Sequence, residues 1–163
     1  MGRLEIMESR RADPIRLVAL RLRQDELKNV VHRPGVNEAF RVSIQHDSRD
    51  HPNQVATLTR GHGGASALKV VYDKPGKEVY FDYTIDAERY KTLVAALRRV
   101  NFDTMDDQPE VPFFGVDLWL VERASGSFYH DVVLSPEGAR GFYRELILAL
   151  REHLKEALRP IGE

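Results

Sequence analysis

Residues 78–85 alternate in the manner of a half-buried strand, and this pattern constrains the fold more than any other feature of the sequence. Counting by twos puts Val79, Phe81, Tyr83 and Ile85 on one side and Tyr80, Asp82 and Thr84 on the other. A Pro-Gly turn at residues 74–77 separates this run from an apolar run at residues 67–73. The two runs therefore predict an antiparallel hairpin.

A second hairpin is predicted from residues 116–123 and 128–134, which are joined by the Ser-Gly turn at residues 124–127. Two weaker strands are expected before both hairpins, at residues 40–45 and 54–60. Because consecutive strands tend to lie side by side, an antiparallel meander of about five to six strands is the simplest topology.

Two helices are predicted in the second half of the chain. Asp86 is a suitable N-cap for an amphipathic helix over residues 87–100. Ser135-Pro136-Glu137 is a typical start for another helix, which should end before Pro160. Residues 15–31 could form a third helix. The sequence thus predicts an α+β fold with two or three amphipathic helices packed on the sheet.

Chain length and composition are those of a globular protein. A chain of 163 residues fits a single domain, within which residues 1–35 could be a helix or an arm and residues 36–163 the sheet-and-helix core. The chain has no cysteine, which excludes disulfides, thiolate nucleophiles and cysteine-ligated metals.

The apolar segments are too short for a membrane span, and the start of the sequence does not look like a signal peptide. We therefore expect no membrane insertion and a cytoplasmic location. A net charge of −1 gives no general attraction to nucleic acid. Nucleic-acid binding remains an alternative only through the N-terminal arginines, which are Arg10, Arg11, Arg16, Arg21 and Arg23.

Aromatic and acidic side chains are expected together on one face of the two hairpins. Trp and Tyr are common at protein interfaces because they combine a large contact area with a polar group. This face could bind a basic or arginine-bearing partner; alternatively, the N-terminal helix covers it and makes it a second core. The predicted partner-binding residues are Tyr80, Asp82, Asp117, Trp119, Tyr129 and Asp131.

The histidines suggest an alternative function. His46, His51 and His62 lie in polar loops, and imidazole is a common ligand of zinc and related ions. With His130 they could form the site of a metal-dependent hydrolase, although their spacing matches no established motif. His130 falls on the apolar side of its strand, where a core histidine with satisfied ring nitrogens is the other interpretation.

No recognisable catalytic set accompanies the aromatic and acidic face. The leading hypothesis is therefore a non-enzymatic protein-binding module, such as an inhibitor, an immunity-type protein or an assembly component. This hypothesis predicts a protein partner and no cofactor, and it leaves homo-oligomerisation open. The metal-dependent hydrolase and the nucleic-acid-binding protein are the alternatives.

Overall fold

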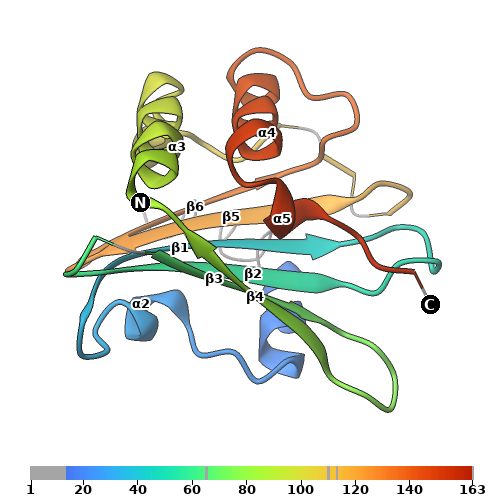
Figure 1. Ribbon diagram of the computed structural model, residues 1–163. Helices are drawn as coiled ribbons and strands as arrows, with labels where there is room; N and C mark the ends of the chain where they lie inside the picture. Colours follow the sequence, from blue (N-terminus) through green and yellow to red (C-terminus); the bar gives the residue numbers. More distant parts are fainter. Residues whose placement is uncertain (1–13, 65, 110, 113, 163) are drawn as a thin grey trace.

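The computed structural model describes residues 14–64, 66–109, 111–112 and 114–162. One antiparallel sheet of six strands dominates it, with the order β4-β3-β2-β1-β5-β6. The predicted α+β fold is confirmed (Figure 1). The strands are β1 (Val36–Gln45), β2 (Gln54–Gly61), β3 (Ser66–Tyr72), β4 (Val79–Ile85), β5 (Leu118–Ser125) and β6 (Phe128–Leu134).

The strands follow one another as two meanders that meet at β1. The first runs from β1 to β4, and the chain then returns through α3 (Ala87–Arg99) to place β5 on the other side of β1. Both predicted hairpins are present, as β3 with β4 and as β5 with β6. The return leaves β4 and β6 as the two edge strands.

Helix α3 is the helix that the sequence predicts most closely. The Asp86 carboxylate accepts a hydrogen bond from the Arg89 amide at 2.8 Å, as an N-cap does. The apolar stripe of α3 packs on one face of the sheet beside α4 (Phe142–His153) and the short α5 (Lys155–Leu158) (Figure 1). A single turn of 3-10 helix, η1 (Phe102–Thr104), follows α3 and contributes Phe102 to this core.

The start of α4 differs from the prediction by six residues: the first helical residue is Phe142 and not Pro136, and the N-cap is Gly141 and not Ser135. Gly138 and Gly141 have φ angles of +77° and +60°, which a right-handed helix cannot contain. The Ser135 hydroxyl is buried and has no hydrogen-bond partner among the described residues, so it does not cap the helix. The C-terminal helix is also interrupted at Leu154, where the backbone leaves the helical region.

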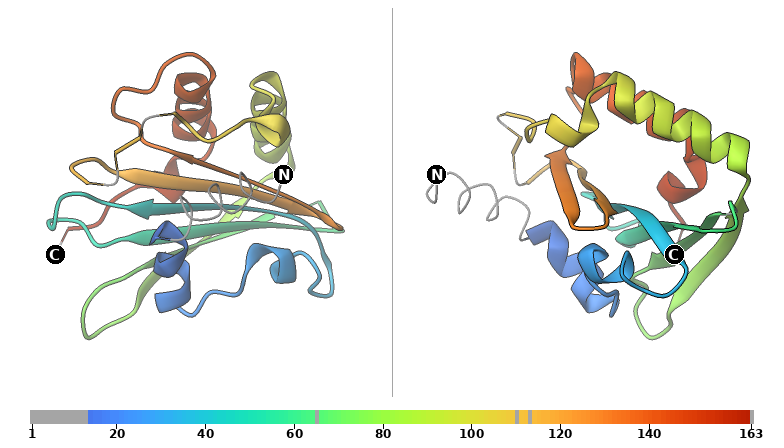
Figure 2. Two further views of the ribbon diagram at one scale, coloured as in Figure 1. Left: turned by 180° about the vertical axis from the view of Figure 1, so that it is seen from behind. Right: turned by 90° about the vertical axis from the view of Figure 1, so that its left-hand side faces the viewer.

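The N-terminal segment covers the opposite face of the sheet. Residues 14–21 are helical, Arg23 has a φ of +55°, and α2 (Leu27–Val30) follows, so the helix expected over residues 15–31 is broken in two. Ile15 packs on β5 and β6, and Val18 packs on β2 and β3. The sheet is therefore covered on both faces, as the side view in Figure 2 shows.

Candidate binding sites

The six residues predicted to form one binding face do not share a face. Trp119 lies opposite Leu134 in the register of β5 and β6, and its side chain is buried in the core under α3 and α4. Leu118 and Leu120 instead point to the face that carries the N-terminal segment. Because both faces of β5 are covered, both of its alternating sets contain large apolar residues, and the sequence alone assigns the two sets to the wrong faces.

Tyr129 and Asp131 do lie together, on the face covered by residues 14–31. The Tyr129 hydroxyl donates to the Glu122 carboxylate at 2.5 Å. Arg16 of the N-terminal helix donates to the Tyr129 hydroxyl at 3.0 Å and forms an ion pair with Asp131. The acidic and aromatic cluster thus binds an arginine, as predicted for a partner, but this arginine belongs to the same chain.

Tyr80 and Asp82 lie far across the sheet on the exposed edge strand β4, where Asp82 is paired in register with Lys69. Asp117 precedes β5 and belongs to a loop contact: its carboxylate accepts a hydrogen bond from the Asp47 amide at 2.8 Å. It also lies 3.6 Å from His46 Nδ1. The predicted set therefore divides into the β4 edge, a loop contact, a core residue and a partly buried arginine site.

The four histidines proposed as metal ligands do not converge. His46 and His51 lie together before β2, with ring centroids 5.5 Å apart, whereas His62 follows β2 at its other end. Eight residues of strand span roughly 26 Å, so His62 is out of reach of the first two. His130 bonds to the Met105 carbonyl at 2.8 Å and packs edge-on against Phe102. Within the described ranges, no three histidine, aspartate or glutamate side chains are placed to share a metal ion.

The N-terminal arginines do not form a free basic face in the part of the chain that the structure describes. Arg10 and Arg11 lie outside the described residues. Arg16 is occupied by Asp131 and Tyr129, and burial lowers its pKa less than these neighbours and Glu122 raise it. Arg21 and Arg23 are exposed; Arg21 ends the first helical segment, and Arg23 is the residue with the positive φ angle at the break. Nothing in this arrangement favours nucleic acid.

The two edges of the sheet differ in how they are covered. At β6, the Gln108 amide donates to the Val133 carbonyl at 3.0 Å, and Asp107 Oδ1 accepts from the Val133 amide at 2.7 Å. The Gln108 side chain accepts in the same way from the Ser135 amide at 2.8 Å. A segment of chain thus takes the place of a seventh strand along part of β6. In contrast, among the described residues β4 pairs with β3 alone.

Aromatic side chains project from both sides of the open β4 edge. Tyr80 is 52% exposed and Phe81 is 44% exposed. In the inner strand β1, by contrast, most consecutive side chains are buried. Lys69 Nζ lies 4.6 Å from the centroid of the Tyr80 ring, and the Phe81 ring packs edge-on against the Tyr72 ring. Each ring therefore contacts one side chain of β3, and about half of its surface is exposed to solvent.

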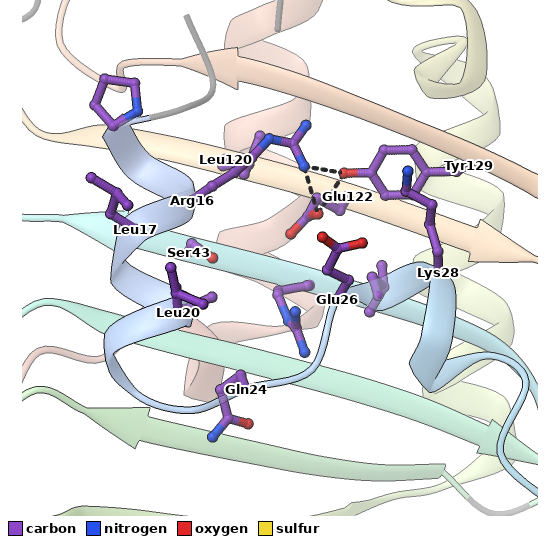
Figure 3. Close-up of a pocket in the computed structure, with 14 residues that line it drawn as sticks. Arg16, Leu17, Leu20, Gln24, Glu26, Lys28, Ser43, Leu120, Glu122 and Tyr129 are labelled. Atoms are coloured by element: carbon purple, nitrogen blue, oxygen red, sulfur yellow. Dashed lines mark hydrogen bonds and ion pairs between the residues drawn. The ribbon is translucent and has the colours of Figure 1, made fainter. Parts of the chain in front are cut away.

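A pocket with charged residues in its floor lies between the N-terminal segment and the sheet (Figure 3). Its volume is about 600 Å³. Arg41 and Ser43 on β1 and Glu122 on β5 form the floor and are 3%, 0% and 5% exposed. These three residues were not predicted from the sequence, although a polar side chain at the centre of an otherwise apolar strand was a signal that could have found them.

The floor of the pocket has unusual electrostatics. Burial raises the pKa of Glu122, an effect that the Tyr129 hydrogen bond and the charges of Arg41 and Arg16 only partly offset. Burial lowers the pKa of Arg41, which donates to the Asp25 carbonyl at 2.7 Å and to Thr57 Oγ1 at 3.0 Å. Burial, together with Glu122 and Asp131, raises the pKa of Tyr129. These shifts favour the uncharged forms of Glu122 and Tyr129 at the base of the pocket.

Comparison with protein-family models and with curated proteins gives no match to this chain, so neither supplies a family assignment. Among the described residues, none of the helices is both long enough and apolar enough to cross a membrane. The function of the chain must therefore be inferred from its own geometry.

Proposed function

We propose that this chain is a non-enzymatic protein-binding module that accepts an extended segment of its partner along the open edge of β4. The observation that carries the proposal is the contrast between the two sheet edges. The β6 edge is covered by residues 107–108, whereas no segment among the described residues covers the outer edge of β4. An uncovered edge strand presents unpaired backbone donors and acceptors, which an added strand satisfies.

The side chains of β4 support this mode of binding. Main-chain pairing supplies affinity, and alternate side chains supply specificity. Phe81 extends from the face that carries α3, and Tyr80 from the opposite face, so an added strand would contact one ring on each side. Burial of exposed aromatic surface contributes about 25 cal/mol per Å². Tyrosine is also among the residues that dominate binding energy at interfaces.

Charge indicates the chemistry of the partner. Asp82 is the central residue of β4, with three residues of the strand on each side. Two copies pairing antiparallel about that centre would place Asp82 opposite Asp82, which is destabilising. A segment with Lys or Arg facing Asp82 and an apolar residue facing Phe81 would be complementary on both sides. The proposed partner segment is therefore extended, basic on one face and apolar on the other.

Capture from cells with matched variants tests the proposal. The bait is the tagged chain, either unchanged or carrying Phe81→Lys; Phe142→Lys, which alters an exposed phenylalanine on α4, is the control. We expect a dominant protein partner that survives nuclease treatment, is retained by Phe142→Lys and is lost with Phe81→Lys. Both substitutions are at exposed positions, so thermal melting should show that each variant stays folded.

Two outcomes would contradict the proposal. A partner that binds the Phe81→Lys chain as well as the unchanged chain would place the interface elsewhere. The absence of any captured protein, in cells where the chain is expressed at its natural level, would remove the reason to regard it as a binding module.

A further inference from the structure

The pocket between residues 14–28 and the sheet is separate from the β4 edge. It is lined by β1, β5 and β6 and by the N-terminal segment, and it includes no residue of β4. Its volume of about 600 Å³ lies within the range typical of small-molecule sites. A ligand bound in this pocket would therefore be independent of a partner bound along β4.

One buried polar group in the pocket floor lacks a partner. Ser43 is fully buried on β1 and lines the pocket, and its hydroxyl forms no hydrogen bond with any part of the chain that the structure describes. A buried hydroxyl without a partner is unfavourable, and most such groups in proteins are satisfied. Figure 3 shows Ser43 between the side chains of Leu20 and Glu122, on the inner side of the pocket. A ligand with a hydrogen-bonding group at this point would satisfy it.

The outer wall of the pocket is apolar and open. Leu17 and Leu20 of the N-terminal helix line it and are 53% and 69% exposed, and Leu120 contributes a buried apolar surface from β5. An occupant would remove the two exposed leucines from water, which is favourable in proportion to the apolar area covered. The pocket therefore combines a polar floor with an apolar wall.

The charged groups around the pocket balance one another. Arg16 is paired with Asp131, and Arg41 lies directly across from Glu122 in the register of β1 and β5. Glu26 and Lys28 contribute one charge of each sign near the rim. An anionic ligand would be repelled by Glu26 and would further oppose the ionisation of Glu122, and a cationic ligand would be repelled by Arg16, Arg41 and Lys28. Only an uncharged polar group avoids both repulsions.

We infer that this pocket binds a neutral amphipathic small molecule, with an amide or hydroxyl group at Ser43 and a hydrocarbon body against Leu17, Leu20 and Leu120. The amide or hydroxyl supplies the partner that the Ser43 hydroxyl lacks, and its hydrocarbon body covers the leucines. Arg16, Arg41, Glu122 and Tyr129 form the fixed polar surroundings of the head group.

Three ligands with one hydrocarbon chain and different heads test this inference. Hexanamide, hexanoate and hexylammonium are titrated into the full chain and followed by NMR. We expect saturable binding of hexanamide and binding at least about tenfold weaker for both charged ligands. Binding of either charged ligand as tightly as hexanamide, or no saturable binding of hexanamide, would overturn the inference.

Ser43→Ala with a matched control locates the head group. Removal of an unpartnered hydroxyl should leave the melting temperature unchanged or higher, but should weaken hexanamide binding about fivefold. Ser135→Ala removes another buried, unpartnered hydroxyl that does not line the pocket, and should leave binding unchanged. Leu20→Ser, at an exposed position, should weaken binding without unfolding the chain. Equal affinity in the unchanged, Ser43→Ala and Leu20→Ser chains would contradict the assignment.

Discussion

Arg89 of α3 and Glu156 of α5 form a two-pronged ion pair that joins the two helices over the sheet. One prong, from Arg89 Nη1 to Glu156 Oε2, measures 2.7 Å, and the second joins Nη2 to Oε1. Arg89 also donates to the His153 carbonyl at 3.1 Å, at the point where α4 ends. The interruption between α4 and α5 is therefore held by a side chain from another helix.

Replacement of Glu156 by Gln should destabilise the protein by about 1–2 kcal/mol at neutral pH, because it removes a partly buried charged hydrogen bond. The Arg89 hydrogen bond lowers the pKa of Glu156. The ionised carboxylate therefore stabilises the fold at pH values above the ordinary pKa of a glutamate, and this contribution is lost as the pH falls through the lowered pKa. Urea unfolding between about pH 7 and about pH 3 should show the difference between the two proteins shrinking toward acid. A constant difference would contradict this account.

Glu122→Gln should show the opposite pH dependence. Burial raises the pKa of Glu122, so its favourable contribution is complete below the unfolded value and is lost as the pH rises through the raised pKa. The variant should therefore gain stability relative to the unchanged chain as the pH is increased from about 4 to about 8. The same urea measurement checks it. If the stability differences of Glu122→Gln and Glu156→Gln changed with pH in the same direction, the pKa shift assigned to one of the two carboxyl groups would be wrong.

Trp119 is the only tryptophan, which makes its burial directly measurable. Its fluorescence should be blue-shifted and poorly quenched by acrylamide in the folded chain. Trp119→Ala should cost about 3–5 kcal/mol, because the side chain fills the core beneath α3 and α4. Efficient quenching of the native protein, or a negligible loss of stability in Trp119→Ala, would contradict the burial of Trp119 in this core.

Asp82 should act against self-association along β4. Asp82→Val removes the like-charge repulsion at the centre of an antiparallel pair and leaves a longer apolar edge. We expect this variant to form dimers or larger species at concentrations where the unchanged chain does not. Sedimentation velocity makes the comparison, with Thr84→Val on the same face as the control. Equal self-association of the Asp82→Val and Thr84→Val chains would argue against a special role for Asp82.

The sequence predicts well those elements whose signals are local. Asp86 caps α3 and the alternation of residues 79–85 identifies β4, because both depend on neighbours in the chain. The start of α4 was predicted wrongly, since the Ser135-Pro136 signal is cancelled by glycines at 138 and 141 whose positive φ angles no periodicity reveals.

The candidate sites were harder to predict because their partners are distant in sequence. Arg16 pairs with Asp131, which lies 115 positions later in the sequence, so the sequence alone could not show that an arginine of the same chain binds the predicted acidic cluster. Trp119 was assigned to the wrong face because a strand covered on both sides has apolar residues in both alternating sets. Arg41 and Glu122 are opposed only by the pairing of β1 with β5, which depends on the return of the chain through α3.

Hydrogen exchange measured on β4 tests the central claim most directly. The partner protein is the one that the capture experiment identifies with both the unchanged chain and the Phe142→Lys chain. It is added to the unchanged chain, and amide exchange in this complex is compared with exchange in the unchanged chain alone. If the partner adds a strand, those amides of residues 79–85 that point away from β3 should exchange slowly only in the complex, because the added strand accepts their hydrogen bonds. Unchanged exchange along β4, with new protection in another part of the molecule, would contradict the account.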